Sequence, residues 1–359
     1  MSFHKMFSAL CLASVMVSGC GAEPAPSERD SVQQAARGDG WYSANYNRLL
    51  GGVIGPEEIS GIYNLDGRWY LSTLNNQTYA PVTRITYGGQ AVEPQDLATS
   101  QGVFVLSGDR ETLVQNRASS LEFTVEGNLN GTLRVTPSST SADGSFTRYT
   151  TEWLAEGTDP DAAGVTFCPH PVTNADGTAG NQAEYVIPIG GARWGANGAR
   201  VNDANSITLG CTHDVIGGCV DWGYGPWGTR VEEGTNQSRS MVTVHQACTR
   251  MKHGDICGSG DAGTTGDDAM TTTIHVKDRV GVHPDTNQTY TTMEAFWDEN
   301  GASCFNLSKY RSSDPVHIAK IQIQLALCPK PACTSTHTRM FLSARPCTAT
   351  NVSGDCIAN

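Results

Sequence analysis

The distribution of cysteines is the feature of this sequence that most restricts its fold. Twelve cysteines occur in 359 residues, and none lies between Cys20 and Cys168. An even number of cysteines in an oxidising compartment predicts a disulfide framework. We expect five disulfides among ten cysteines, whose pairing is open, although the clustering of the last four favours pairing among themselves: Cys168, Cys211, Cys219, Cys248, Cys257, Cys304, Cys328, Cys333, Cys347 and Cys356.

The N-terminus has the three parts of a secretory signal. Lys5 supplies the positive charge, residues 6–17 are apolar, and two small residues stand directly before Cys20. A helix of 12 residues spans about 18 Å, which is too short for a bilayer core of about 30 Å. Residues 17–20 (VSGC) predict a lipobox, with cleavage after residue 19 and lipidation of Cys20. The alternative is an ordinary signal peptide, with Cys20 an unmodified thiol.

Residues 21–40 predict a flexible tether. They include two prolines, several charges and almost no large apolar side chains, so they cannot bury enough surface to fold. A coil of this length reaches about 25 Å. Gly21, and not Asp, follows the cysteine, and by resemblance to the sorting rule of bacterial lipoproteins we expect an extracytoplasmic location at the outer membrane. The N-terminal lipid is the expected membrane contact, since no later segment stays apolar for 18 residues.

Composition predicts a mainly β fold, rich in turns and disulfides, with few short helices. Glycine alone accounts for 39 residues, and Asn, Thr and Ser are also frequent. Loss of residues 1–19 leaves 23 basic and 36 acidic residues, a formal net charge of −13. This charge argues against nucleic acid as a partner and is ordinary for a soluble surface. We expect no cofactor.

Alternating apolar residues and turn signals predict strands in the first half of the chain. Residues 61–65 and 68–71 flank an Asp-Gly turn, which is typical of a hairpin. Further strands are predicted at 121–125, 131–135, 145–154, 184–188 and 207–209, with a loop at 137–144.

Two segments of the second half predict regular elements. Residues 239–252 predict a helix, with Gly254 as its C-terminal stop. Residues 317–327 alternate well enough to predict a strand. The chain thus divides into a signal, a tether, a β-rich N-terminal region, a disulfide-rich domain and a cysteine-rich C-terminal extension, at 1–19, 20–40, 41–156, 157–315 and 316–359.

Four segments stand in a recognisable order: Cys219–Tyr224 followed by Pro226 and Trp227; His245–Met251; Gly254–Gly258; and Glu294, Ala295, Trp297, Gly301, Ala302 and Cys304. Together they resemble the ADYC-domain family of bacterial envelope proteins, over about residues 120–311. The resemblance implies a domain and an envelope location, and it implies no reaction. Two departures fall in the namesake motif: Gly254 replaces Ala, and Ile256 replaces Tyr, so chemistry by that hydroxyl is closed to this chain.

Cysteine and histidine occur close together at three places. One interpretation of His245 and Cys248 is a nucleophile pair. The interpretation that we favour is that Cys248 forms half of a disulfide and that His245 is a packed histidine. The pairs Cys168 with His170 and Cys211 with His213 add a zinc hypothesis, although no Cys-x-x-Cys pair accompanies them. Acidic loops at 159–161, 174–177 and 261–268 offer oxygen ligands for calcium but lack the twelve-residue loop pattern. We therefore assign no metal ligand.

An aromatic run provides the best candidate for binding. Asp221, Trp222, Tyr224 and Trp227 lie on a Gly/Pro-rich segment, where flat rings stack on sugars and the carboxylate accepts a hydroxyl hydrogen bond. The favoured alternative is that the tryptophans fill a core beside the Cys219 disulfide, since aromatic side chains bury the largest area.

Carboxylates near Trp297 provide the candidate for hydrolysis. Glu294, Asp298 and Glu299 belong to a region, residues 285–299, that supplies acids for glycoside hydrolysis if two of them face each other across a cleft. We assign no catalytic residue. The expected function is therefore non-enzymatic, namely binding of a glycan or an envelope partner or a structural role; the alternative is a secreted-type hydrolase acting on a glycan or envelope polymer. The oligomeric state is left open.

The lipobox predicts the intact mass of the protein extracted from membranes. We expect an increase of triacyl size at Cys20 after loss of residues 1–19, and no thiol alkylation without reductant. An unmodified mass would contradict lipidation, and one or two alkylated cysteines would revive the thiol and metal hypotheses, starting with Cys248 and Cys257.

Overall fold

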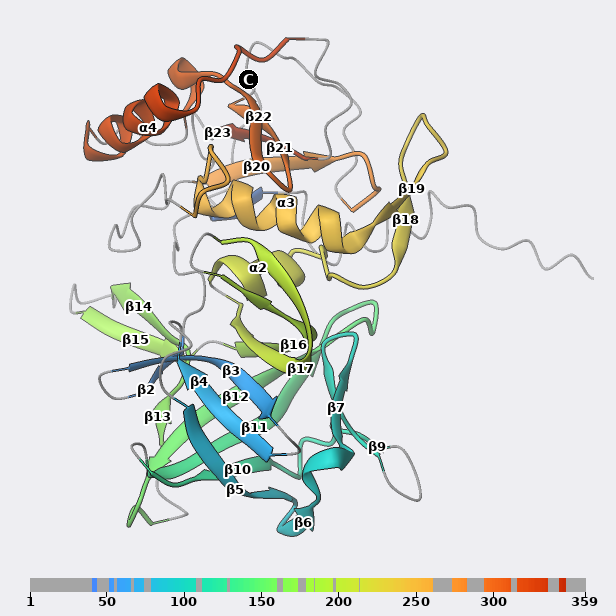
Figure 1. Ribbon diagram of the computed structural model, residues 1–359, viewed down its shortest axis with the longest axis vertical. Coiled ribbons are helices and arrows are strands. Elements are labelled where there is room, and N and C mark those ends of the chain that lie inside the picture. Colours follow the sequence, from blue (N-terminus) through green and yellow to red (C-terminus); the bar gives the residue numbers. More distant parts are fainter. Residues whose placement is uncertain are drawn as a thin grey trace, which may run out of the picture.

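The computed structural model describes most of the chain from Trp41 to Pro346. The described residues are 41–43, 52–54, 57–65, 68–73, 79–107, 112–127, 130–159, 164–173, 179–183, 185–195, 198–212, 214–260, 273–282, 294–310, 315–334 and 342–346. The predicted signal and tether, Cys20, Cys347 and Cys356 lie outside them. The fold is mainly β, as predicted, and forms two bodies that meet at a short helix (Figure 1).

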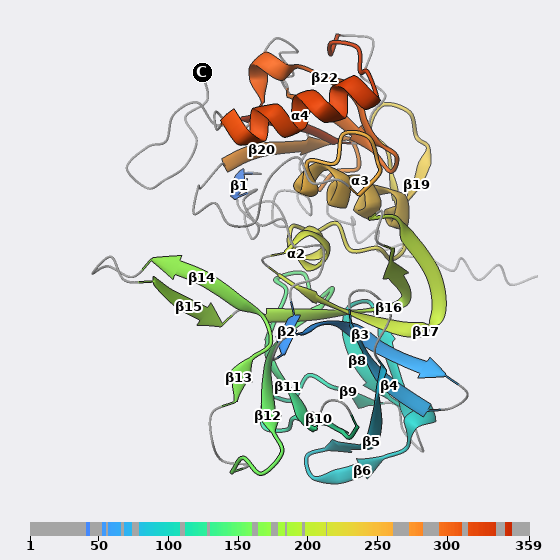
Figure 2. The ribbon, with the colours of Figure 1, turned by 60° about the vertical axis from the view of Figure 1, so that its left-hand side comes forward.

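The lower body is a ring of antiparallel strands. Its members are β3 (Glu57–Leu65), β4 (Arg68–Thr73), β5 (Tyr79–Tyr87), β10 (Leu121–Val125), β11 (Gly131–Thr140), β12 (Thr147–Ala155), β16 (Tyr185–Trp194) and β17 (Arg200–Cys211). Each strand pairs with the next in this order, and β17 pairs with β3, so the hydrogen bonding closes on itself (Figure 2). The 11-stranded sheet that contains the ring also includes β2 (Gly52–Ile54), β6 (Gln90–Val92) and β13 (Val165–Thr166).

Period-two alternation fills the ring with apolar side chains. Leu121, Phe123, Leu133 and Val135 are fully buried, and the residues between them point outward. The predicted hairpin at 61–71 is confirmed as β3 and β4, with Leu65 paired to Arg68.

The predicted loop at 137–144 is wrong in its first half. The strand β11 continues to Thr140, and the register shifts between Pro137 and Ser139. Proline is tolerated in a strand at such a bulge, because the ladder is locally interrupted there.

Tyr149 connects the ring to a small sheet made of β7 (Leu97–Ser100), β8 (Val103–Leu106) and β9 (Thr112–Leu113). Its buried hydroxyl donates to the carbonyl of Val114 at 2.8 Å and accepts the N–H of Phe104 at 3.0 Å. Burial raises the pKa of this hydroxyl far above its usual range. The aromatic ring of Tyr149 also packs edge-on with that of Phe104, with 5.3 Å between the two ring centroids. The small sheet is thereby fixed against the core of the ring.

The upper body consists of a five-stranded sheet and α3 (Met241–His253). The sheet has the order β1 (Trp41–Ser43), β20 (Thr273–Asp278), β23 (Leu342–Pro346), β21 (Ala295–Asp298) and β22 (Gly301–Phe305). The helix agrees with the prediction for 239–252: Ser240 caps its N-terminus, and Gly254 ends it in the left-handed conformation (φ 66°). A residue without a Cβ adopts this conformation at little cost.

A short helix, α2 (Val215–Asp221), lies between the two bodies (Figure 1). Ile216 and Val220 pack with Ile187 and Trp194 of β16 in a separate apolar cluster. On its other side, a disulfide joins Cys219 of α2 to Cys248 of α3. The helix thus links the ring to the upper body through apolar packing on one side and a covalent bond on the other.

Four disulfides occur among the described residues. They join Cys168 to Cys211, Cys219 to Cys248, Cys257 to Cys328, and Cys304 to Cys333. The expectation that the last four cysteines pair among themselves is wrong, because Cys328 and Cys333 are bonded to cysteines of the preceding domain. These two disulfides staple the described part of the C-terminal segment to the upper body.

The predicted strand at 317–327 is also wrong, because these residues form α4 (Pro315–Leu327). The sequence HIAKIQIQLAL fits both periods, but the buried residues His317, Ile321 and Gln324 recur at helical spacing. Pro315 at the first position is favourable for a helix. None of the described helices has the length and apolar character needed to cross a membrane.

Short elements complete the description. They are the hairpins β14 (Pro169–Thr173) with β15 (Ala179–Ala183) and β18 (Thr229–Val231) with β19 (Ser238–Ser240), and the 3₁₀ turns η1 (Pro94–Asp96) and η3 (Leu307–Lys309).

The hydrogen bonds of Tyr149 predict the effect of removing its hydroxyl. Tyr149→Phe leaves two buried backbone groups without a partner, and we expect it to lower the free energy of unfolding by about 1–3 kcal/mol. Urea denaturation measures the change, with Tyr87→Phe, on the partly buried rim of the same core, as the control. Equal stability of Tyr149→Phe and the wild type would contradict the role of this side chain.

Candidate functional site

The aromatic run at 221–227 is largely built into the interior. Trp222 and Tyr224 are 6% and 0% exposed and belong to the core of the upper body. The Tyr224 hydroxyl donates to Asp278 at 2.9 Å, and the Lys252 ammonium lies 4.8 Å from the centre of the Trp222 ring. Neither ring presents a face for stacking on a sugar, in agreement with the favoured alternative.

The two remaining residues of this run have partners of their own. Asp221 accepts a hydrogen bond from Arg148 of β12 at 2.6 Å. Trp227 is partly buried and packs against the cluster between α2 and the ring. The ion pair and the packing fasten the segment to the ring.

His245 lies fully buried at the junction of the two bodies. Its Nε2 donates to the carbonyl of Ile216 at 3.1 Å, because a carbonyl only accepts, and its Nδ1 has no hydrogen-bond partner among the described residues. The aromatic ring of Trp194 packs edge-on against the His245 imidazole, with 5.5 Å between the two ring centroids. Burial lowers the pKa of His245 to about 3, and the charge of Arg200 adds to the effect. With Cys248 in a disulfide, this pair has no thiolate for catalysis.

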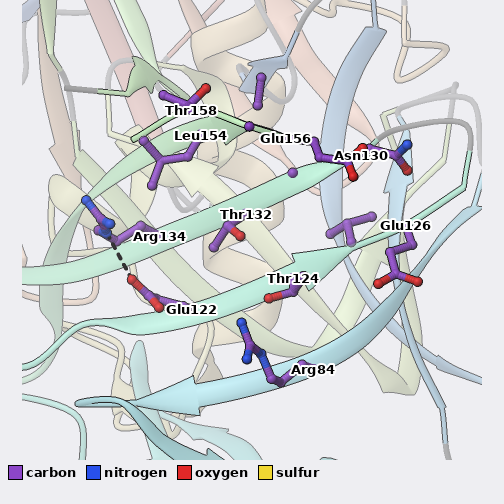
Figure 3. Close-up of a pocket in the computed structure, with 14 residues that line it drawn as sticks. Arg84, Glu122, Thr124, Glu126, Asn130, Thr132, Arg134, Leu154, Glu156 and Thr158 are labelled. Carbon is purple, nitrogen blue, oxygen red and sulfur yellow. Dashed lines mark hydrogen bonds and ion pairs between the residues drawn. The ribbon is translucent and has the colours of Figure 1, made fainter. Parts of the chain in front are cut away.

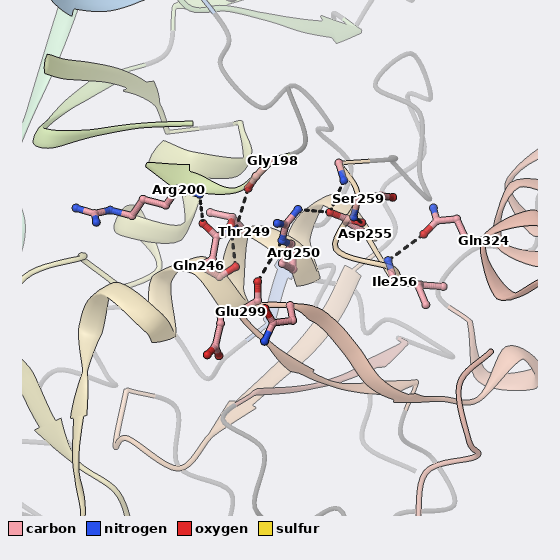
Figure 4. A network of polar contacts seen from close by, with 12 residues as sticks. Gly198, Arg200, Gln246, Thr249, Arg250, Asp255, Ile256, Ser259, Glu299 and Gln324 are labelled. Atoms are coloured by element: carbon pink, nitrogen blue, oxygen red, sulfur yellow. Dashed lines mark hydrogen bonds and ion pairs between the residues drawn. The ribbon is translucent and has the colours of Figure 1, made fainter. Parts of the chain in front are cut away.

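The namesake segment, Gly254–Gly258, is held by a polar network (Figure 4). Asp255 is fully buried, pairs with Arg250 of α3, and accepts the backbone N–H groups of Ser259 and Gly260 at 3.0 and 2.9 Å. Ile256 is buried in the apolar core, and its N–H donates to Gln324 of α4 at 2.9 Å. This network fixes the turn after α3 and docks α4 on it.

The candidate acids lie along one strand and its turn. Glu294 is fully buried directly before β21, whereas Asp298, at the end of the strand, accepts the N–H of Asn300. They are four positions apart in extended chain, so their Cα atoms are about 13 Å apart, whereas the two carboxyl groups of a glycosidase pair are about 5–9.5 Å apart. Glu299 adjoins Asp298 on the turn and accepts Arg250 through its backbone carbonyl. Residues 285–293 lie outside the described part of the chain.

The zinc hypothesis loses its thiolates. Cys168 and Cys211 are bonded to each other, and Cys248 is bonded to Cys219, so none of the three is free to ligate a metal. Within the described ranges, no group of three or more His, Cys, Asp or Glu side chains is arranged to hold an ion. His213 and most of the acidic loops proposed for calcium fall outside those ranges.

A polar groove on the outer wall of the ring is the candidate binding site (Figure 3). It has a volume of about 310 Å³ and lies across β5, β10, β11 and β12. Strand register sets one row of neighbours across it: Arg84 is opposite Thr124, Thr124 is opposite Thr132, and Thr132 is opposite Leu154. We call Arg84, Thr124 and Thr132 the open row.

A second row runs beside the open row and is internally paired. Arg134 donates to Glu122 at 3.0 Å and lies 3.7 Å from a carboxylate oxygen of Glu152. Thr86 donates to the other oxygen of Glu122 at 3.3 Å. The charge of Arg134 is thus balanced by two carboxylates.

The open row has no such pairing. Arg84 is exposed, and its guanidinium makes no ion pair with any described residue. The hydroxyls of Thr124 and Thr132 are half-buried beside it. The rim of the groove adds polar side chains from the loops at the strand ends: Glu126, Asn130, Glu156 and Thr158.

Sequence reasoning missed this groove. The strands that carry it were largely predicted, and the outward positions of residues 122, 124, 132 and 134 follow from their alternation. The signal that defines the groove is the pairing of β5 with β10, which joins residues 34 or more positions apart and leaves no local pattern in the sequence.

The lower body is a closed ring of strands, the upper body is a sheet with helices, and α2 and α3 link them through a disulfide. The chain is thus a disulfide-stapled β protein with a polar groove on the outer wall of the ring. A family model described as the ADYC domain matches residues 114–311, more than half of the chain. The chain belongs to the ADYC-domain family. No curated protein matches the chain, and no solved structure matches it.

The lowered pKa of His245 predicts acid sensitivity. The neutral form is favoured in the folded state, so the unfolded state binds more protons between pH 6.5 and about 3, and the stabilisation present above pH 6.5 is lost as the pH falls through this window. From pH 7 to pH 5 we expect a loss of about 2 kcal/mol in the free energy of unfolding. In urea titrations between pH 7 and pH 5, the free energy of unfolding of His245→Gln should not show this loss. Parallel pH profiles of His245→Gln and the wild type would refute the prediction.

Proposed function

We propose that this chain is a lipid-anchored envelope protein that binds a hydroxyl-rich ligand, a glycan or glycan-containing polymer, in the groove of its ring. The single observation that carries the binding role is the open row, in which a cation and two hydroxyls line up across three strands with no side-chain partner among the described residues. Polar groups held on rigid strands and left unpaired are suited to a polar ligand, because no internal bond must break on binding.

The envelope location is supported by the N-terminal sequence and by the cysteine chemistry. The predicted signal ends in a predicted lipobox, residues 17–20, whose last residue is Cys20. Four disulfides between segments 29 to 71 residues apart are expected where thiols are oxidised. A tether between the lipid and the folded body leaves the groove free to meet large polymers.

The open row is the part of the groove that suits an acidic group of a ligand, while Glu126 and Glu156 place two carboxylates on the rim. Arg134 is neutralised by Glu122 and Glu152, so Arg84 is the cation that remains for a ligand carboxylate or sulfate. The neighbouring threonine hydroxyls are both donors and acceptors and match sugar hydroxyls. A planar guanidinium recognises a carboxylate through two parallel hydrogen bonds. A uronic-acid glycan therefore fits the open row better than a neutral glycan.

The alternative of a hydrolase has less support. The buried Glu294 and the turn residue Asp298 are about 13 Å apart along β21. The described acids of the groove serve ion pairs or stand on its rim: Glu122 and Glu152 both contact Arg134, and Glu126 and Glu156 lie at the strand ends. Binding without turnover accounts for this arrangement.

The proposal predicts the effect of removing the guanidinium. In calorimetric titration with an oligogalacturonate, Arg84→Ala should weaken binding about 10–100-fold, since a charge-assisted hydrogen bond contributes about 1.5–3 kcal/mol. Binding of the corresponding neutral galactose oligomer should change little. Arg117→Ala, at an exposed arginine outside the groove, is the matched control.

Two results would contradict the proposal. One is that Arg84→Ala changes the binding of neither the acidic nor the neutral glycan. The other is the failure of the folded protein, its melting temperature verified, to retain any member of a panel of neutral and uronic-acid oligosaccharides.

A further inference from the structure

The helix α4 exposes an apolar stripe. Val316, Ile323 and Leu327 are 61%, 62% and 76% exposed, although side chains of this kind are usually covered. Ile323 and Leu327 follow Val316 by 7 and 11 residues, which places each of them within about 20° of a line along the helix through Val316 at 100° per residue. Ala319 and Ala326 are exposed on the same side. The stripe is thus a continuous face and not a set of scattered residues.

A second face of α4, about 100° around the helix from the stripe, fixes the orientation of the helix. Ile321 is fully buried in the core of the upper body, and Gln324 accepts the backbone N–H of Ile256. The disulfide between Cys257 and Cys328 ties the C-terminal end of α4 to the namesake segment. The helix α4 itself lies on the part of the upper body away from the ring (Figures 1 and 2), and the stripe residues are exposed on it.

The charge around α4 is opposite to that of the chain. Residues 305–333 contain four basic residues and one acidic residue, whereas the whole chain has a formal net charge of −12. Lys320 lies on the helix four residues after Val316 and three before Ile323, at the border of the stripe. Apolar residues bordered by lysine are typical of helices that lie in the interface of an anionic membrane.

The predicted tether ends on the same body. The strand β1, which begins at Trp41, pairs with β20 in the five-stranded sheet (Figure 2). Ile321 of α4 belongs to the core of the same body. A coil of 20 residues reaches about 25 Å, so a lipid at Cys20 holds this body, and not the distant ring, next to the bilayer.

We propose that α4 lies along the anionic lipid surface to which the chain is anchored, with Val316, Ile323 and Leu327 in the interface. This inference rests on the lipid anchor of the proposed function. A second copy of the chain is a poorer occupant, because a symmetric contact would place Lys320 and its basic neighbours against their own copies. The orientation turns the ring and its groove away from the membrane, towards polymers.

Photo-crosslinking of the full lipidated chain in vesicles tests the contact. The vesicles contain phosphatidylglycerol and phosphatidylcholine, and p-benzoylphenylalanine replaces the residue at position 323 or, as a matched control, the exposed Gln322 about 100° around the helix. We expect about fivefold more lipid adduct, measured by mass, from position 323 than from 322. Lys320→Glu should lower the yield on these vesicles and leave it unchanged on phosphatidylcholine alone.

The outcomes separate this inference from the anchor on which it rests. Equal or absent lipid adducts at the two positions, or adducts mainly to a second copy of the chain, would overturn the contact of α4. The intact mass of the same sample reports acylation of Cys20 independently. If the chain is acylated but gives no adduct, only the proposed role of α4 is contradicted. If the chain carries no acyl group, the proposed anchor is contradicted.

Discussion

The pairing of β5 with β10 is the constraint on which the lower body depends. It closes eight strands into a ring, so that every strand has two neighbours and none is left as an exposed edge. Closure directs one set of side chains into a shared core and the alternate set to the outer wall. The same pairing places Arg84 beside Thr124, so the candidate site is a direct product of the closure that stabilises the body.

Membership of the ADYC-domain family covers only part of this architecture. The matched residues 114–311 include β10, β11, β12, β16 and β17 but not β3, β4 and β5, which complete the ring. They also end before α4 and β23. Two proposed features, the open row through Arg84 and the lipid-facing helix, therefore depend on flanking segments outside the matched domain, and the chain uses both flanks to finish its two bodies.

The namesake segment has a structural role in this protein. Asp255 fixes the turn through Arg250 and two backbone N–H groups, and Cys257 binds the segment covalently to α4. Ile256, in place of the tyrosine, fills the apolar core. Breaking a buried ion pair by removing one partner is costly because the other charge stays buried. The segment thus joins α3 to α4 and determines which face of α4 is left exposed.

Local patterns in the sequence determined the elements whose energetics are local: the hairpin at 61–71, the alternating strands at 121–135, and the helix ending at Gly254. The sequence also carried the family motif, which the family model confirms, and a pattern at its N-terminus that predicts a signal. Only the tertiary structure decided the disulfide partners of Cys328 and Cys333, the helical state of 317–327, whose pattern fits both periods, and the groove at Arg84. Each of these depends on contacts between segments far apart in the chain, and such contacts leave no periodic signal in either segment alone.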